Sequence, residues 1–163
     1  MGLYTYGDIT SIPNALTQLY SVFQAAYPLD ANGQQVFFWF GAELGAWSAP
    51  TTIEINGVHP ADQEPADVSQ AFLREETFSI DCKITTFSGG ATTQADFFAS
   101  MNATWNVWIA LSIAVANNPM LNGVVRYAEF GEMDYSPTTD AKGMCMGTLT
   151  WATRCSARVT SLS

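Results

Sequence analysis

The sequence predicts an α+β fold in which two helices pack on a mostly antiparallel sheet of about four to five strands. Three patterns lead to this prediction: strict apolar–polar alternation at 76–87, an amphipathic helical pattern at 11–27, and a longer apolar helical pattern at 93–118. The 163 residues suit one domain. We expect it to carry an N-terminal arm at 1–10 and an insertion or loop region at about 41–74.

The first helix has clear start signals and one apolar face. Ser11 stands where a cap is expected, and Pro13 suits the first helical turn, which needs no N–H partner. Its apolar residues recur with helical spacing at Leu16, Leu19, Tyr20 and Phe23. Aromatic and β-branched residues then predict two strands, at 34–40 and 51–58. The segment 59–70, which is rich in proline and acidic residues, is predicted to be a loop.

The second helix carries a wide apolar stripe, expected to lie across a sheet. The stripe is formed by Phe97, Met101, Trp105 (or Thr104), Trp108, Ser112 and Val115, widened by Phe98, Ile109 and Leu111. Pro119 and the pair Asn122–Gly123 predict a break and a turn. A strand, a polar loop and a final strand follow at 124–130, 131–142 and 143–159. These two strands and the strand at 78–87 are expected to form an antiparallel meander under the long helix.

The composition is acidic and poor in charge. Fifteen acidic residues against six basic ones give a net charge of −9, and charged residues make up only 13% of the chain, against a usual share of about 25%. Two explanations stay open: the protein buries surface against copies of itself, or uncharged polar residues cover it. The acidity argues against binding nucleic acid through phosphates. An acidic surface repels DNA, which suits a channel through which DNA slides.

No motif in the sequence predicts catalysis, a metal site or a membrane span. The N-terminus lacks a signal-peptide pattern, and the apolar stretch 105–116 is too short to span a bilayer, so we expect a soluble protein with no membrane partner. Cys82, Cys145 and Cys155 lack metal-ligand spacing and are expected to be free buried thiols. His59 has no convergent partners. We therefore expect no enzymatic activity and no cofactor.

The order of motifs resembles a known family of phage proteins. The strand "ETFSIDCKITTFSGG" is followed by the long helix, then "PMLNGVVRYAEF", a polar loop and "GTLTWATRCSARV". This pattern is similar to the tail terminator (tail completion) proteins of long-tailed phages of actinobacteria, over roughly residues 11–159. Two segments depart from it: 38–50, and 55–67 with its many prolines and acidic residues.

The resemblance implies a virion protein, assembled in the host cytoplasm, that forms a ring at the head-proximal end of the tail tube. Its partners would be itself, as a homohexamer, the major tail tube protein, the head–tail connector protein, and genomic DNA passing through the lumen without specific binding. The ring would stop tube polymerisation and join the tail to the connector.

A head-to-tail ring needs two different patches on each subunit. We expect one patch on the polar loop and the other on the outer aromatic residues, and the outward face of the last strand adds further candidate residues. The candidate interface residues are Met133, Tyr135 and Pro137, then Trp39 and Trp47, then Arg154 and Arg158.

Two other functions stay open. The first is a head-completion or connector protein of the same phage neck, since fold does not fix function. The second is a small-ligand-binding α+β domain in which the aromatic cluster at 37–40 and 47 lines an apolar pocket. This second reading predicts a monomer or dimer that a specific ligand stabilises.

Overall fold

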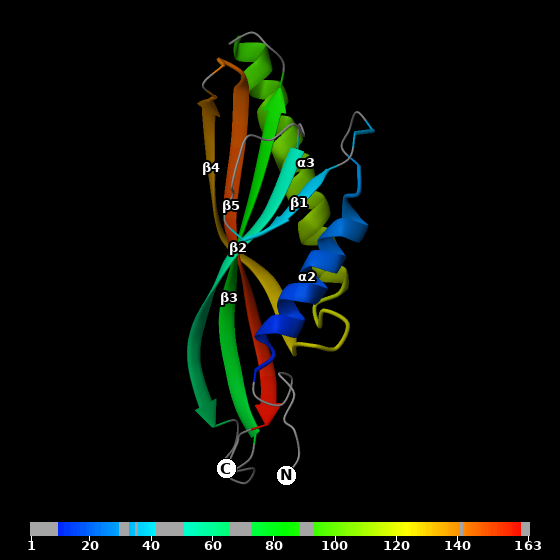
Figure 1. Cartoon of the computed structure of the whole chain (residues 1–163), viewed down its shortest axis with the longest axis vertical. Coiled ribbons are helices and arrows are strands. Elements are labelled where there is room, and N and C mark those ends of the chain that lie inside the picture. The colour runs from blue at the N-terminus through cyan, green and yellow to red at the C-terminus, as the bar shows by residue number, and fades with distance from the viewer. Residues whose placement is uncertain are drawn as a thin grey trace.

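The computed structural model describes residues 10–29, 33–34, 36–41, 51–65, 73–88, 93–140 and 142–160, without the side chains of 61–65, 73–74 and 160. Within these ranges the chain forms two helices and five strands (Figure 1). The helices are α2 (Ile12–Ala26) and α3 (Gln94–Asn117). The strands are β1 (Phe37–Phe40), β2 (Thr51–Pro65), β3 (Leu73–Ser88), β4 (Tyr127–Thr139) and β5 (Cys145–Thr160). The predicted α+β fold is confirmed.

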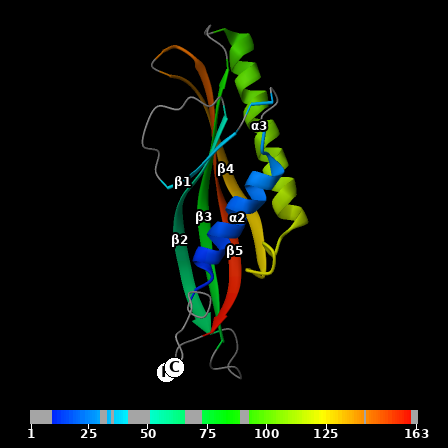
Figure 2. The ribbon, with the colours of Figure 1, turned by 45° about the vertical axis from the view of Figure 1, so that its right-hand side comes forward.

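The strands form one sheet in the order β1-β2-β3-β5-β4. β1 runs parallel to β2, and every other neighbouring pair is antiparallel. Both helices lie on the same side of this long, twisted sheet (Figures 1 and 2). We name this the helix side, and the opposite side the polar side.

The predicted meander is wrong in its strand order, because β5 lies between β3 and β4. The reason is the helix between them. The 24 residues of α3 span about 36 Å at 1.5 Å per residue, which carries the chain back along the sheet. β4 therefore starts from the same end as β3 and runs parallel to it, and the antiparallel β5 fills the place between them.

Two predicted loops are strands. β2 continues to Pro65 through the segment expected as a loop at 59–70, and β4 continues to Thr139 through the one expected at 131–142. Both continuations are at the rim of the sheet: β4 is its last strand, and β1 pairs only with Thr52–Ile55 of β2. Prolines and charges, which suggested loops, are also the residues that edge strands use. Register shifts, at Phe130/Met133 in β4 for example, bend these strands.

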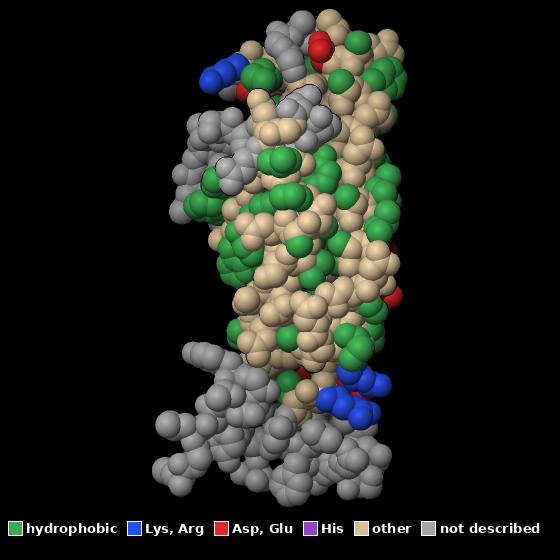
Figure 3. All heavy atoms as spheres, turned by 90° about the vertical axis from the view of Figure 1, so that its right-hand side faces the viewer, with side chains coloured by type: hydrophobic (Ala, Val, Ile, Leu, Met, Phe, Trp, Pro, Cys, Tyr) green, Lys and Arg blue, Asp and Glu red, His purple; other side chains and the backbone are tan. Residues whose placement is uncertain are grey.

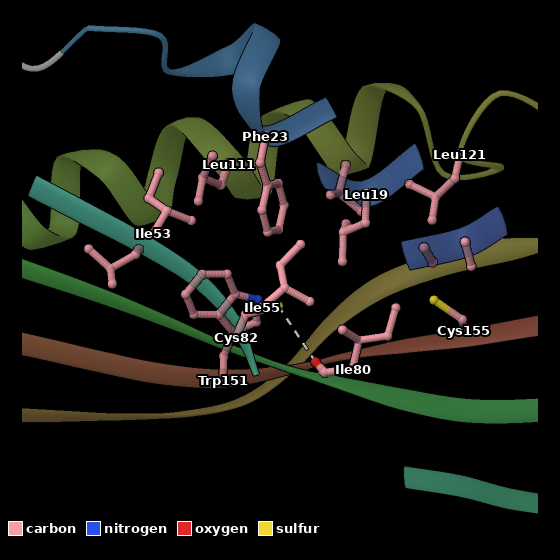
Figure 4. Packing of buried hydrophobic residues seen from close by; sticks show 14 of the residues in the cluster. Leu19, Phe23, Ile53, Ile55, Ile80, Cys82, Leu111, Leu121, Trp151 and Cys155 are labelled. Carbon is pink, nitrogen blue, oxygen red and sulfur yellow. Dashed lines mark hydrogen bonds between the residues drawn. The ribbon is translucent and has the colours of Figure 1, made fainter. Parts of the chain in front are cut away.

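The core lies between the helices and the sheet. α2 buries Ala15, Leu19 and Phe23, which confirms two of its four predicted core residues, while Leu16 and Tyr20 are half-buried. Figure 4 shows Phe23 reaching from α2 toward Trp151 of β5. Their ring centroids are 6.0 Å apart, and a further aromatic ring, that of Phe130, lies 5.0 Å from Trp151.

The stripe predicted for α3 is rotated from the observed one. The buried residues are Ser100, Thr104, Val107, Leu111 and Val115, whereas Phe98 and Ile109 are exposed. Small polar residues face the sheet because the helix approaches it closely at Gly147. A Cβ there would lie 2.8 Å from Ser100 Oγ and closer still to Thr104 Oγ1. The two tryptophans of the predicted stripe occupy the flank of α3 toward β4.

The turn after α3 confirms the predicted break. α3 ends at Asn117, and Leu121, Asn122 and Gly123 all have positive φ angles, of 45°, 58° and 87°. The amide of Asn118 brackets this turn: its Oδ1 accepts from the backbone N–H of Asn122 at 3.0 Å, and its Nδ2 donates to the Asn122 side chain at 2.9 Å. Leu121 is fully buried, so the strained turn is fixed by the core.

We expect Gly147→Ala to destabilise the fold by about 1–3 kcal/mol, because the added methyl group must push α3 off the sheet. Urea unfolding would measure the loss. Gly57→Ala is the matched control, since a Cβ at that strand position meets no atom within 4 Å. Equal stability of the two variants would contradict the close approach.

A buried carboxylate from β3 holds the start of α2. Glu76 is 1% exposed and accepts hydrogen bonds from the Ser11 N–H and Ser11 Oγ, both at 2.8 Å, and from Thr10 Oγ1 at 2.7 Å. Ser11 is the N-cap, as predicted, but its side chain makes no capping bond within the helix. Glu76 takes that role and places a negative charge at the positive end of the helix dipole.

We expect Glu76→Gln to lower the free energy of unfolding by about 1.5–3 kcal/mol, because an amide turns a donor toward the donors at the start of α2. The exposed Glu129→Gln, on β4, is the control and should stay within about 0.5 kcal/mol of the parent. Chemical denaturation of both variants measures this. A stable Glu76→Gln protein would show that the carboxylate does not hold the helix.

All three cysteines are free and buried, as predicted. Cys82 Sγ donates to the carbonyl of Ile80 at 3.6 Å (Figure 4). Burial raises the pKa of the Cys82 thiol, and it raises the pKa of Cys155 to about 12. The folded-state pKa values therefore exceed the unfolded ones. Above a pH of about 8.5 the unfolded chain loses these protons first, so stability falls as pH rises.

Near pH 7 we expect the buried thiols to make the free energy of unfolding neither rise nor fall with pH. Above about pH 8.5 it should fall, by up to about 1.4 kcal/mol per pH unit for each buried thiol. Denaturation curves across this range measure the slope, and Cys155→Ala should reduce it. The native thiols should also resist an aromatic disulfide reagent until the protein unfolds. Rapid labelling of the folded protein would contradict this burial.

Candidate assembly surfaces

Three of the predicted interface residues lie in the edge strand β4 and not in a loop. The register places Met133, Tyr135 and Pro137 opposite Trp151, Leu149 and Gly147 of β5, which puts all three on the helix side. Met133 is 45% exposed, Pro137 is exposed and Tyr135 is half-buried. The structure therefore brings these three residues together along one edge of the sheet.

The flank of α3 packs against this edge through aromatic rings. The centroid of Trp105 is 6.2 Å from that of Tyr135 and 5.7 Å from that of Trp108, which in turn is 5.9 Å from Phe130. We name Met133, Tyr135, Trp105 and Trp108 the α3–β4 seam. Sequence reasoning placed both tryptophans in the core. The edge position of β4, which the sequence does not reveal, makes them part of a surface.

Two polar atoms within the seam lack hydrogen bonds. The Trp108 Nε1–H and the Tyr135 hydroxyl are buried and have no partner in the described part of the protein. Burial also raises the pKa of the Tyr135 hydroxyl. A buried polar group without a partner costs about 1–3 kcal/mol, so these two atoms lower the stability of the seam.

The outward crest of α3 is apolar and nearly uncharged. Phe98, Ile109 and Ile113 are 52%, 46% and 54% exposed, and Asp96 is the one charged residue in the helix. Figure 3 shows hydrophobic side chains spread over this helix-covered face, with charged ones near its two ends. By length and composition α3 would suffice to cross a membrane, a property that core helices of soluble proteins share. In this protein the buried stripe of α3 packs on the sheet. The absence of a membrane partner stays a prediction.

The opposite edge of the sheet is aromatic. In β1 the register places Phe38 and Phe40 opposite Ile53 and Ile55 on the helix side, and Phe37 and Trp39 on the polar side. Phe40 is 56% exposed, whereas Trp39 is half-buried and stacks on Phe37 with ring centroids 5.8 Å apart. Phe40 thus presents more surface than the predicted Trp39. The predicted Trp47 lies outside the described residues.

Two apolar rows cross the whole sheet on the helix side and end at both edges. Following the register from β1 to β4, each row has a buried aliphatic, cysteine or tryptophan centre and a partly or largely exposed end on each side. The first row is Phe40, Ile55, Cys82, Trp151 and Met133, and the second is Phe38, Ile53, Ile84, Leu149 and Tyr135. The core of this protein therefore reaches the surface at two opposite edges.

The remaining predicted interface residues, Arg154 and Arg158, are exposed on the polar side of β5. They stand next to Glu129 of β4 and Glu75 of β3 in the register. Glu75 already pairs with Arg126 at 3.1 Å and accepts from the Ser156 hydroxyl at 2.8 Å. The structure thus separates these two arginines from the apolar edges.

An acidic hollow of about 490 Å³ is lined by Asp81, Glu132 and Asp134 together with Asn56, Cys82, Met133, Thr150 and Trp151. The register places Asp81 and Asp134 on the polar side. His59 Nε2 lies 2.6 Å from Asp81 Oδ2 at the surface. Among the described residues, no three His, Cys, Asp or Glu side chains are grouped as a metal site would require.

One buried ion pair escaped the sequence analysis. Glu54 is 2% exposed and lies opposite Lys83 on the polar side, with 3.3 Å between its Oε2 and Lys83 Nζ. The alternation of β2 and β3 predicts that the two side chains share a side, but not that this position is shielded from water. Removing one partner would leave an uncompensated buried charge, so we regard the pair as structural.

Comparison with known proteins gives little further information. No protein-family profile and no curated protein matches the sequence. Among solved structures, the chain is similar to one in the virion of a native gene transfer agent particle. The identity is 13%, the match covers 94% of this chain and 100% of the other, and the TM-score is 0.40. A likeness of this degree carries no argument about function.

Proposed function

We propose that this protein is a subunit of a homo-oligomeric ring, a homohexamer, that closes the head-proximal end of a phage tail tube. The ring stops tube polymerisation and offers a surface to the head–tail connector protein. One observation carries the proposal: apolar core rows end at partly or largely exposed residues on two unlike, opposite edges of the sheet.

Two unlike patches are what a ring requires. A head-to-tail contact joins different surfaces of neighbouring copies, and it closes when the rotation between them divides a full turn. A specific interface buries about 800 Å² on each partner. The α3–β4 seam, the α3 crest and the β1 edge together provide apolar surface on both flanks of the subunit. These apolar surfaces also explain the low charge content of the chain, because residues buried in an interface between copies are seldom charged.

The electrostatics support passage of DNA through such a ring. The net charge is −9, and the polar side carries Asp81 and Asp134, two of the acidic residues that line the hollow. An acidic lumen repels phosphates, so genomic DNA would pass without binding. The sequence resemblance to tail terminator proteins supplies the tail tube protein and the connector as the remaining partners.

The structure bears differently on the two other candidate functions, a neck connector protein and a small-ligand-binding domain. A head-completion or connector protein of the neck would use the same fold and the same edges, so it stays the second candidate. The ligand-binding reading required the aromatic residues at 37–40 to line an apolar pocket. The hollow that the structure shows is lined by three acidic residues among others, and none of those four aromatics contributes to it. We therefore favour assembly over ligand binding.

We expect a phage that lacks this gene to produce tails of excessive or variable length, detached from filled heads, as seen by negative-stain electron microscopy. Tails of normal length beside unjoined heads would instead assign the protein to the head side of the neck. Intact virions would contradict both neck functions.

Met133→Asp should abolish ring formation and fail to restore infectious particles, because it places a charge at the end of an apolar row. Native mass spectrometry and plaque complementation measure the two effects. Ser136→Asp is the matched control on the exposed polar side of the same strand and should behave as the parent protein. Since Met133 is at the surface, both variants should fold, which circular dichroism checks. A Met133→Asp protein that assembles normally would exclude this edge from the interface.

A further inference from the structure

We infer that the α3–β4 seam is covered by the β1 edge of the next copy, so that the two apolar rows continue from subunit to subunit. Met133 of one copy would meet Phe40 of the next, and Tyr135 would meet Phe38. This inference rests on the proposed ring and names the partner of its interface.

The register itself aligns the two edges. Phe40 and Met133 are the two ends of a single cross-strand row, and Phe38 and Tyr135 are the ends of the next row on the same side. A neighbour displaced sideways along the sheet therefore brings Phe40 level with Met133 without a shift along the strands. Both pairs lie on the helix side, so no copy needs to turn over.

Charge disfavours the simplest alternative, a two-fold contact between two β4 edges. β4 carries three exposed acidic residues, Glu129, Glu132 and Asp134. Two such strands placed side by side would bring like charges together, which is unfavourable. β1, with the sequence "FFWF", carries no charge, and neither does the exposed Leu29 that precedes it in the chain. The uncharged edge is thus the better neighbour for the acidic one.

The exposed residues at the two edges match in kind. Phe40 is 56% exposed on one edge, and Met133 is 45% exposed on the other. A thioether beside an aromatic ring is a favourable pair of about 0.3–1.5 kcal/mol, and methionine adapts to the shape of its partner. The contact would also shield the seam, where Tyr135 and Trp108 already hold buried polar atoms that lack hydrogen bonds.

Disulfide crosslinking in assembled particles tests the contact. The double variant Phe40→Cys/Met133→Cys is supplied to a phage lacking the gene, and particles are oxidised and examined on non-reducing gels. The three native thiols are buried, so they add no background. We expect a ladder of crosslinked multimers up to the full ring, absent from each single variant. Ser136→Cys/Phe40→Cys is the control, because Ser136 is on the polar side of β4, and it should give no ladder.

Three other outcomes would overturn the inference, in distinguishable ways. Particles that contain the protein as an oligomer but show no crosslink from the double variant would leave the ring in place and reject this partner edge. A dimer from Met133→Cys alone would establish a contact between two β4 edges. Absence of the protein from particles, with normal tails in the phage lacking the gene, would reject the proposed function as well.

Discussion

The close approach of α3 to the sheet at Gly147 is the contact on which the rest of the structure depends. Thr104 Oγ1 and Thr86 Oγ1 are 2.6 Å apart, and both hydroxyls reach the carbonyl of Ser100, at 2.8 and 3.1 Å. These bonds satisfy hydroxyls that would otherwise be buried at a cost. A helix held this close leaves no room for large side chains beneath its first half. The aromatic residues of α3 therefore lie on its flank and its crest, where they contribute to the seam and the exposed apolar surface.

The sequence predicts the existence and type of the elements well, because periodicity is local. The alternation in β3 gives Phe78, Ile80, Cys82 and Ile84 as one face, and all four are buried. The face of α3 is harder to predict. Ser100 lies off the predicted stripe and Thr104 is only the alternative to Trp105 on it, whereas the glycine opposite them explains why both are buried. That pairing joins residues more than forty positions apart in the chain, so no window of sequence contains it.

The candidate surfaces, too, contain features that the sequence predicts and features that it does not. Met133, Tyr135 and Pro137 were chosen as loop residues, and the structure keeps them together for a different reason, since alternate positions of a strand share one side. Trp105 and Trp108 were assigned to the core because a wide aromatic stripe usually lies on a sheet. Their role at the seam follows from the strand order, which places β4 at the rim. Strand order depends on how α3 returns the chain, a non-local property that residue patterns do not carry.

The two edges of the sheet are protected in ways that leave one kind of contact open. Natural edge strands avoid uncontrolled pairing through charges, prolines and bulges, and β4 has all three: acidic residues, Pro137 and the shift at Phe130/Met133. These features hinder addition of another strand and contact between two identical edges. They do not cover the apolar row ends on the helix side. An edge that rejects its own copy and still presents Met133 and Tyr135 selects an unlike, uncharged partner. A subunit that carries such a partner on its opposite edge is suited to an assembly that ends by closing on itself.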